Sequence, residues 1–263
     1  MEEIYIKIYA LYFSPTGTTK KVIDIICSPW KCEKMYFDLS DATNSVLDIT
    51  FEENDVCVVA TPSFSGRVPQ FIIPKLQKLC GNKAKAILIT TYGNRAFDDT
   101  LIELKNTMEG SGFLCISAVA SATRHSVIPK YGAGRPDSRD IKELEGFSIK
   151  CKNAIEHIES TVSVPGNMPY RKYLSIPVKP KINNKCIGCG LCYKKCPVQA
   201  IPLEHLNTTN KEKCISCMQC ITLCPKKARY ISRLVRKIAE IKMKKLCDGR
   251  KSNEFFVQLN SNN

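Results

Sequence analysis

The sequence contains no apolar stretch that approaches the roughly 18 residues needed to span a bilayer, so no transmembrane segment is expected. Its N-terminus does not resemble a signal peptide, because Glu2 and Glu3 stand where a basic region belongs. The P-loop signature G-x4-G-K-S/T and the dinucleotide fingerprint G-x-G-x-x-G are both missing. These absences argue against a nucleotide triphosphatase and against a recognisable nicotinamide site. No acid–base constellation identifies a catalytic reaction either, so the sequence leaves open whether the protein is an enzyme.

Positive charge is concentrated in the C-terminal part of the chain. The formal net charge is +14, yet residues 1–160 carry 19 Lys and Arg against 20 Asp and Glu, whereas residues 161–263 carry 20 against 5. Ligating thiolates with their iron would lower the second value by several units without removing the asymmetry. We therefore expect a partner with an acidic surface. Nucleic acid is not expected, because the basic residues form no recognised binding motif.

Eight cysteines in the last third of the chain form two copies of one pattern, C-x2-C-x2-C-x3-C-P. A thiolate at every third residue lets a tight loop surround three corners of an iron–sulfur cube, whereas the fourth cysteine is carried into the other half. The spacing therefore predicts two 4Fe-4S clusters with crossed ligation. Cluster one would be bound by Cys186, Cys189, Cys192 and Cys224, and cluster two by Cys214, Cys217, Cys220 and Cys196.

Zinc, disulfides and free thiols are the alternatives for these cysteines. Zinc sites use paired C-x2-C units separated by a long loop, without a third cysteine at the same interval. Disulfides would suit a small secreted domain. The other seven cysteines are scattered, as expected of reduced core thiols: Cys27, Cys32, Cys57, Cys80, Cys115, Cys151 and Cys247. This distribution predicts a reducing, cytoplasmic compartment.

Residues 4–160 alternate strand-like apolar runs with helix-like runs, which is typical of a doubly wound α/β fold with helices on both faces of a parallel sheet. We expect five strands, near residues 4–13, 34–38, 55–60, 85–91 and 113–120. We expect helices near residues 18–27, 69–80, 96–109 and 138–160. The connection between the second and third strands shows no clear helix.

The loop after the first expected strand consists of small hydroxyl residues around a glycine, with the sequence Ser14-Pro15-Thr16-Gly17-Thr18-Thr19. Its amides and hydroxyls, aided by the positive end of the following helix dipole, can bind a phosphate group. The loop has no lysine, so a single phosphate monoester fits better than a triphosphate. An ordinary helix N-cap is the alternative, because helices often begin with serine or threonine.

This loop resembles the phosphate loop of flavodoxins, and with the strand order included the resemblance covers roughly residues 4–160. It implies FMN, with the flavin ring at the C-terminal ends of the third and fourth strands. The candidate FMN-binding residues are Ser14, Thr16, Gly17, Thr18 and Thr19 in the first loop, Pro62, Ser63, Phe64, Ser65, Gly66 and Arg67 after the third strand, and Thr91, Tyr92, Gly93, Asn94, Arg95 and Asp98 after the fourth.

Several of these candidates have a plainer interpretation. Phe64 and Tyr92 are either flavin contacts or ordinary turn aromatics. Arg67 and Arg95 could stabilise a reduced flavin anion, although exposed arginines are more often only solvated. His125, which follows the fifth strand, is either a ligand contact or a capping histidine, and residues 131–140 could form a flap over the same crevice.

Over nearly its full length the sequence resembles the flavodoxin/ferredoxin fusion proteins of anaerobic bacteria and archaea. We expect a flavodoxin-like domain (1–160), a linker (161–180), a small α+β ferredoxin-like domain with two 4Fe-4S clusters (181–228) and a C-terminal basic helix with a tail (229–263). The resemblance implies an electron-transfer protein that passes electrons between the clusters and FMN. The alternative is an FMN-dependent reductase of a small organic acceptor, such as a quinone or nitro compound. The oligomeric state is not defined.

Two C-terminal segments carry apolar residues that need a partner. In the linker, Tyr170, Tyr173, Leu174 and Ile176 are expected to dock onto one of the domains. The segment 229–247 predicts an amphipathic basic helix, for which packing on the ferredoxin-like domain is favoured over docking an acidic partner or an anionic membrane. The tail after residue 253 is polar, and we expect it to fray.

Overall fold

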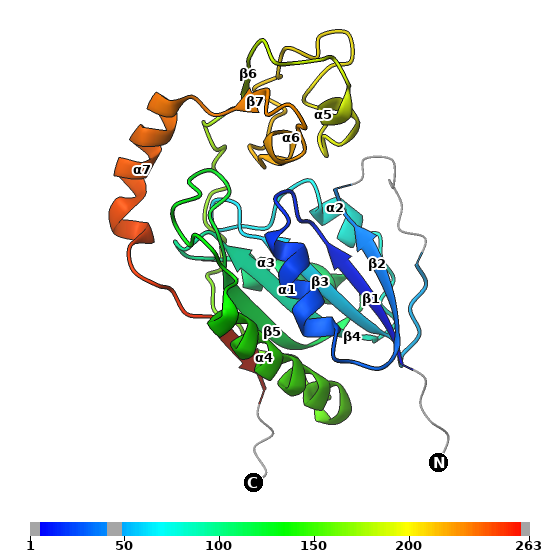
Figure 1. Ribbon diagram of the computed structural model, residues 1–263. Helices are drawn as coiled ribbons and strands as arrows, with labels where there is room; N and C mark the ends of the chain where they lie inside the picture. The colour runs from blue at the N-terminus through cyan, green and yellow to red at the C-terminus, as the bar shows by residue number, and fades with distance from the viewer. Residues whose placement is uncertain (1–5, 41–48, 259–263) are drawn as a thin grey trace.

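The computed structural model describes residues 6–40 and 49–258, which form a larger α/β domain and a smaller cysteine-rich domain above it (Figure 1). The large sheet has the strand order β2-β1-β3-β4-β5-β8. Its strands are β1 (Lys7–Tyr12), β2 (Glu33–Asp38), β3 (Val56–Pro62), β4 (Lys85–Tyr92), β5 (Leu114–Ala122) and β8 (Glu254–Val257). The first five strands are parallel and follow the flavodoxin-like order, so the predicted doubly wound fold is confirmed.

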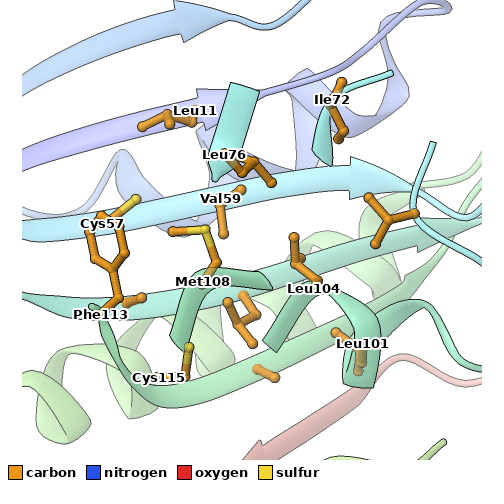
Figure 2. Packing of buried hydrophobic residues seen from close by; sticks show 14 of the residues in the cluster. Leu11, Cys57, Val59, Ile72, Leu76, Leu101, Leu104, Met108, Phe113 and Cys115 are labelled. Carbon is orange, nitrogen blue, oxygen red and sulfur yellow. The ribbon is translucent and has the colours of Figure 1, made fainter. Parts of the chain in front are cut away.

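Helices cover both faces of this sheet. Helices α1 (Thr18–Cys27) and α4 (Ser138–His157) lie on one face, and α2 (Ile73–Leu76) and α3 (Thr100–Gly110) lie on the other. Along β4, Ile87 and Ile89 pack toward α1 and α4, whereas Leu88 packs toward α2 and α3. Figure 2 shows the core on the α2 and α3 face, to which Leu76 of α2 and Leu101, Leu104 and Met108 of α3 contribute. Because both faces are buried, the central strands are apolar throughout rather than alternating.

The elements differ from the sequence prediction mainly at their ends. Helix α2 covers only four residues of the expected 69–80, because Pro74 has no amide to donate within a longer helix. Helix α3 begins at Thr100 rather than near residue 96, since Asn94 and Asp98 have positive φ angles that no α-helix contains. The first two residues of the strand expected at 4–13 lie outside the described residues, and so does the segment 41–48 between β2 and β3.

Residues 254–257 form β8, the sixth strand of the large sheet, which corrects the expectation of a frayed tail after residue 253. Strand β8 pairs antiparallel with β5, with Val119 opposite Phe255. Phe255 packs on Phe147 of α4 on one face, and Phe256 packs near Phe97 on the other, with ring centroids 5.5 and 6.5 Å apart. Three apolar side chains thus hold this strand to the domain: Phe255 and Val257 pack on one core and Phe256 packs on the other. Residues 259–263 lie outside the described part.

The smaller domain contains little regular structure. Its elements are β6 (Lys181–Ile182), β7 (Arg229–Tyr230), α5 (Leu191–Lys194) and α6 (Gln219–Thr222), and β6 pairs antiparallel with β7. Helix α7 (Arg233–Cys247) leaves this domain and runs along the side of the molecule back to the large sheet (Figure 1). Within the described residues, no helix combines the length and the apolar character needed to cross a membrane.

The position of α7 differs from the favoured expectation. Its polar contacts go to the loop after β5 rather than to the cysteine-rich domain: the Tyr131 hydroxyl donates to the Glu240 carbonyl at 2.9 Å, and Lys130 forms an ion pair with the Glu240 carboxylate at 3.0 Å. Ala239 and Met243 pack inward, against a small cluster that both domains share. The helix therefore bridges the two domains.

The linker docks on the large domain, as expected. The carboxylate of Asp99 accepts hydrogen bonds from the amides of Asn167 and Arg171, at 2.9 and 2.7 Å. These bonds hold the pKa of Asp99 below its usual value although burial opposes them. The Tyr170 ring lies 4.6 Å from the guanidinium of Arg67. The domains are thus joined by a fixed segment rather than by a free tether.

Candidate cofactor sites

The eight cysteines of the repeated pattern surround two cavities in the smaller domain. One cavity is lined by Cys186, Cys189, Cys192 and Cys224. A second cavity is lined by Cys214, Cys217, Cys220 and Cys196. The fold therefore brings the fourth cysteine of each pattern to the first three of the other, which is the crossed grouping that the spacing predicts.

Backbone amides point at the sulfur atoms of the fourth cysteines. The amide of Ala200 donates to Cys196 Sγ, and that of Ala228 donates to Cys224 Sγ, both at 3.2 Å. Burial alone would raise the pKa of Cys224, but hydrogen bonds from the amides of Arg229, Ala228 and Lys226 lower it below its usual value. Such bonds stabilise a thiolate, which is the form that binds iron.

The arrangement of these thiols does not suit a single ion. Among the described residues, no three His, Cys, Asp or Glu side chains converge closely enough to bind one metal ion. Thiolates at the corners of an iron–sulfur cube are separated by the cube itself, so they lie farther apart than four ligands of one zinc ion. The two cysteine-lined cavities fit 4Fe-4S clusters better than zinc.

A larger crevice of about 430 Å³ lies at the C-terminal ends of the parallel strands, where ligands bind in doubly wound sheets. Eleven of the FMN-binding candidates line it: Thr16, Thr18, Thr19, Pro62, Ser63, Phe64, Ser65, Gly66, Thr91, Gly93 and Arg95. The three loops that the sequence singles out after β1, β3 and β4 therefore meet at one site.

The hydroxyl loop is held in shape by its own side chains. Gly17 has a φ of 87° and precedes the first turn of α1, and the Ser14 hydroxyl accepts a hydrogen bond from the Lys20 amide at 2.8 Å. The hydroxyls of Thr19 and Thr91 are hydrogen-bonded at 2.8 Å, which ties the loop to β4. The first amides of a helix have no acceptor in a preceding turn, so this loop presents donors suited to a phosphate.

Two glycines of the crevice are required by the chain's own packing. A Cβ atom on Gly66, where φ is 78°, would lie 2.7 Å from Cβ of Asp98. A Cβ atom on Gly93 would lie 2.8 Å from Cα of His125. The absence of a side chain at these positions lets neighbouring loops approach each other, so the glycines shape the crevice independently of any cofactor.

Four candidates bind other parts of the chain instead of lining the crevice. Arg67 forms two hydrogen bonds with the Glu103 carboxylate, at 2.7 and 2.6 Å. The Tyr92 hydroxyl donates to the Ser252 carbonyl at 2.7 Å, and burial raises its pKa to about 12. Asn94 donates to the carbonyls of Cys247 and Gly249, and Asp98 pairs with Arg95 and Arg171. Ser14 and Gly17 also do not line the crevice, although both shape its first loop.

His125 lies in the crevice with a defined protonation state. Its Nδ1 atom accepts hydrogen bonds from the amides of Val127 and Ile128, at 3.1 and 3.3 Å. Burial, with the positive charge of Arg95, lowers its pKa to about 4. The imidazole is therefore neutral near pH 7, and its proton is on Nε2.

Sequence reasoning missed much of the crevice wall. The loop after β5 contributes Thr123, Arg124, Ser126, Val127 and Ile128, the linker contributes Arg171, Leu174, Ile176, Pro177 and Val178, and α7 contributes Ala239, Lys242, Met243 and Leu246. The available signal was that the linker and α7 carry apolar residues that a free tether or a solvated helix would not need. Nothing in the sequence indicated where those residues dock.

The second cysteine cavity lies next to this crevice. Met218 lines that cavity and also packs with Val127, Ile128 and Val178, which line the crevice. Cys217 and Ile215 from the same loop contact the core of the large domain. In contrast, Cys186 and Cys189 of the first cavity are exposed to solvent.

Residues 171–229 match the family model described as a 4Fe-4S dicluster domain. Solved structures similar to the rest of the chain include a flavodoxin from Archaea (13% identity, TM-score 0.41, 57% of this chain and 99% of that one). They also include a flavodoxin from Streptococcus pneumoniae (18% identity, TM-score 0.41, 56% of this chain and 98% of that one). A third is a Fusobacterium nucleatum flavodoxin bound to flavin mononucleotide (16% identity, TM-score 0.40, 56% of this chain and 97% of that one). No curated protein sequence matches the chain.

The chain thus joins a flavodoxin-like α/β domain, defined by its own strand order, to a 4Fe-4S dicluster domain. This fold and domain order fit the resemblance to flavodoxin/ferredoxin fusion proteins that the sequence carries.

Proposed function

We propose that this protein transfers electrons between two 4Fe-4S clusters and an FMN bound in the crevice. The observation that carries this proposal is the contact between the cluster-two loop and the crevice wall. Met218 packs in one buried cluster with Val127, Ile128 and Val178, so buried side chains rather than solvent connect the second cysteine cavity with the crevice at this point. Electron transfer between centres depends on such close approach.

The residues of the crevice fit FMN. Thr16, Thr18 and Thr19 supply hydroxyls and helix-terminal amides for a phosphate, and Phe64 supplies an aromatic face beside them. No Asp or Glu is among the described residues that line the crevice, so nothing there repels an anionic cofactor. A bound FMN would supply redox chemistry with one or two electrons, whereas each cluster carries one electron at a time.

The two clusters have different surroundings, which supports an order of transfer. The first cysteine cavity faces solvent, where Ile187 is 62% exposed and Lys185, Lys226 and Lys227 are exposed beside it. We infer that an acidic redox protein exchanges electrons with cluster one at this basic rim. Cluster two would then connect cluster one with the crevice, because Cys217 and Ile215 of its loop pack against the core of the large domain.

A second candidate function is the reduction of a small organic acceptor. Its support is the crevice itself, whose volume of about 430 Å³ falls within the roughly 300–1,000 Å³ of typical ligand pockets. The linker and α7 add walls to the crevice that a protein partner would have to displace. A small molecule could enter beside the cofactor without displacing them.

The first test is composition and spectrum after anaerobic purification. We expect flavin bands above a broad iron–sulfur shoulder. We also expect that Cys224→Ala and Cys214→Ala each lose about half of the iron, since each removes one ligand of one cluster. Cys80→Ala is the matched control, because Cys80 is exposed and lines neither cysteine cavity. A colourless wild-type protein would contradict the proposal.

The second test is rapid mixing of the anaerobic protein with substoichiometric reductant, followed at the flavin and cluster bands. Cys224→Ala should retain internal redistribution, because the cluster-two loop still packs on the crevice. Cys214→Ala should lose it while keeping cluster one. If the two bands fill independently in the wild type, the centres are not connected. Saturable reduction of a small acceptor would favour the second candidate.

A further inference from the structure

We propose that the end of the crevice farthest from the hydroxyl loop is a second anion-binding subsite, formed by Arg124 and Lys242, that takes a small aromatic or planar carboxylate. This inference rests on the proposed function only in assuming that FMN occupies the hydroxyl-loop end. It assigns a ligand class to the part of the crevice that lies beyond the loops after β1, β3 and β4, which carry the candidate FMN-binding residues.

The two ends of the crevice are separated by the sheet itself. The hydroxyl loop follows β1, whereas Arg124 follows β5, and β3 and β4 lie between them. Three strand spacings amount to about 14 Å. Arg124 therefore stands beyond the loops that follow β3 and β4, and a phosphate held by Thr16, Thr18 and Thr19 is out of its reach.

The positive charge at this far end is not neutralised by the chain. Four cationic residues line the crevice, namely Arg95, Arg124, Arg171 and Lys242. Arg95 and Arg171 both form ion pairs with Asp98. Arg124 and Lys242 form no ion pair within the described residues, and both are exposed at the crevice rim. The remaining charge favours an anion with access from solvent.

The lining of the crevice near these two cations is largely apolar. It includes Val127, Ile128 and Val178 together with Met243 and Leu246 of α7, and Met243 packs against the first three. Polarizable methionine adapts to flat ligands of different shapes. A ligand that fits both features has a flat apolar body and one negative group.

His125 adds a hydrogen-bond donor to the same region. Because its Nδ1 atom accepts from the Val127 and Ile128 amides, its proton is on Nε2, and Nε2 has no partner among the described residues. A neutral donor beside two cations suits a carboxylate, which accepts hydrogen bonds at both oxygens.

Helix α7 is fixed in the position that brings Lys242 to the crevice. The bond from the Tyr131 hydroxyl to the Glu240 carbonyl and the Lys130–Glu240 ion pair hold the helix against the loop that contains His125. Lys237 and Lys244 lie on the same helix but do not line the crevice. They provide matched controls that remove the same charge at a different place.

The experiment measures binding of benzoate and of the neutral analogue benzyl alcohol to the FMN-loaded, cluster-containing protein, by perturbation of the flavin absorbance and by calorimetry. We expect benzoate to bind about tenfold more tightly at low salt, with the preference falling as ionic strength rises. Arg124→Gln and Lys242→Gln should each remove most of this preference. Lys237→Gln and Lys244→Gln should leave it unchanged. Equal affinity of the wild type for the two probes would overturn the inference without any variant.

A second measurement separates the subsite from the cofactor's own phosphate site. FMN and riboflavin affinities are compared in Arg124→Gln and in Thr19→Val. We expect Thr19→Val to reduce the preference for FMN and Arg124→Gln to leave it intact. Loss of the preference in Arg124→Gln would assign the cation to the cofactor phosphate and overturn the inference. Flavin content and internal redistribution in the same variants show separately whether the proposed function holds.

Discussion

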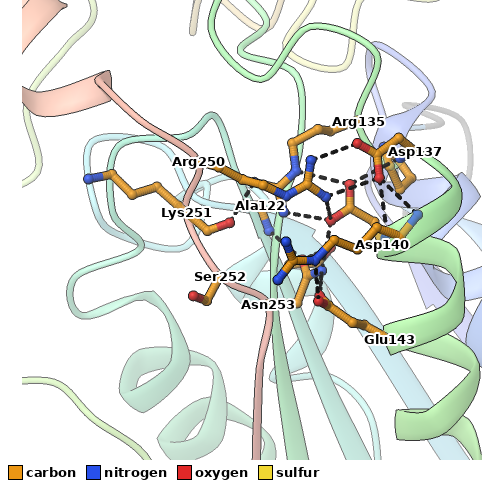
Figure 3. A network of polar contacts seen from close by, with 12 residues as sticks. Ala122, Arg135, Asp137, Asp140, Glu143, Arg250, Lys251, Ser252 and Asn253 are labelled. Atoms are coloured by element: carbon orange, nitrogen blue, oxygen red, sulfur yellow. Dashed lines mark hydrogen bonds and ion pairs between the residues drawn. The ribbon is translucent and has the colours of Figure 1, made fainter.

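The guanidinium of Arg135 donates two hydrogen bonds to the carboxylate of Asp140, at 2.9 and 2.6 Å, where the two side chains are only 3% and 0% exposed. Figure 3 shows that this pair is the centre of a polar network with the end of the chain. Arg135 also donates to the Lys251 carbonyl at 2.6 Å, and Asn253 donates to Asp140 at 3.0 Å. The pair therefore fixes the segment between α7 and β8.

Asp140→Asn should be strongly destabilising. The substitution leaves the Arg135 charge buried without a counter-charge, and breaking a buried pair from one side costs about 3–5 kcal/mol. Urea unfolding of the purified protein measures the loss. Arg139→Ala is the control, since the Arg139–Glu143 pair is exposed and its removal should cost less than about 0.5 kcal/mol. Equal costs for the two variants would contradict this account of the network.

Stability should fall as the pH drops from about 6.5 toward 4, because of His125. Its pKa is lowered to about 4 in the folded protein by burial and by the charge of Arg95. The unfolded chain, with an ordinary histidine pKa of about 6.5, binds more protons in this interval, so folding is favoured as pH rises and the full contribution is present above about 6.5.

This contribution can be isolated by comparing the wild type with His125→Asn. We expect the difference in unfolding free energy between pH 7 and pH 4.5 to shrink in the variant by about 2 kcal/mol. An unchanged profile in His125→Asn would mean that the imidazole is not buried neutral.

Gly66→Ala should lower both stability and flavin affinity. Its φ is positive, and the added methyl group would collide with the Asp98 side chain, which pairs with Arg95 at the crevice. Gly134→Ala is the matched control, because Gly134 also has a positive φ but no atom within 4 Å of the added Cβ. The free energy of unfolding of Gly134→Ala should fall by only about 1 kcal/mol, because of backbone strain alone. Thermal unfolding and FMN titration measure the two effects.

Asn94 tests the difference between the sequence interpretation and the structure. Asn94→Gly keeps the left-handed backbone but removes the bonds to the Cys247 and Gly249 carbonyls. We expect faster proteolysis and hydrogen exchange in residues 248–257, with FMN affinity changed less than about twofold. Tyr92→Phe, which loses the bond to Ser252, should behave in the same way. A large loss of FMN affinity without a looser tail would favour direct flavin contact.

The parts of the site that could be predicted are those built from local spacing. Cysteines at every third residue can be presented by a single loop, and each of the two cavities is lined by three cysteines of one pattern and the fourth of the other. The hydroxyl loop was also recognisable, because Gly17 and its neighbours lie at a strand-to-helix junction. Arg67, Tyr92 and Asn94 are different. Each stands in a loop at the crevice, but its partner lies tens to over a hundred residues away, so adjacency in sequence could not show which way it points.

The amino-acid sequence by itself determined the two domain types and their order, since periodic apolar runs and repeated cysteine spacing are local properties of the chain. Only the tertiary structure decided what closes the crevice and what completes the edge of the large sheet. Val178 in the linker, Met243 in α7 and Phe255 in β8 meet the flavodoxin-like domain through contacts between residues far apart in the chain. Such contacts form because the apolar area that they bury and the hydrogen bonds that they make outweigh the entropy lost in ordering the segments. This sum depends on the whole fold, so no short segment of sequence reveals it.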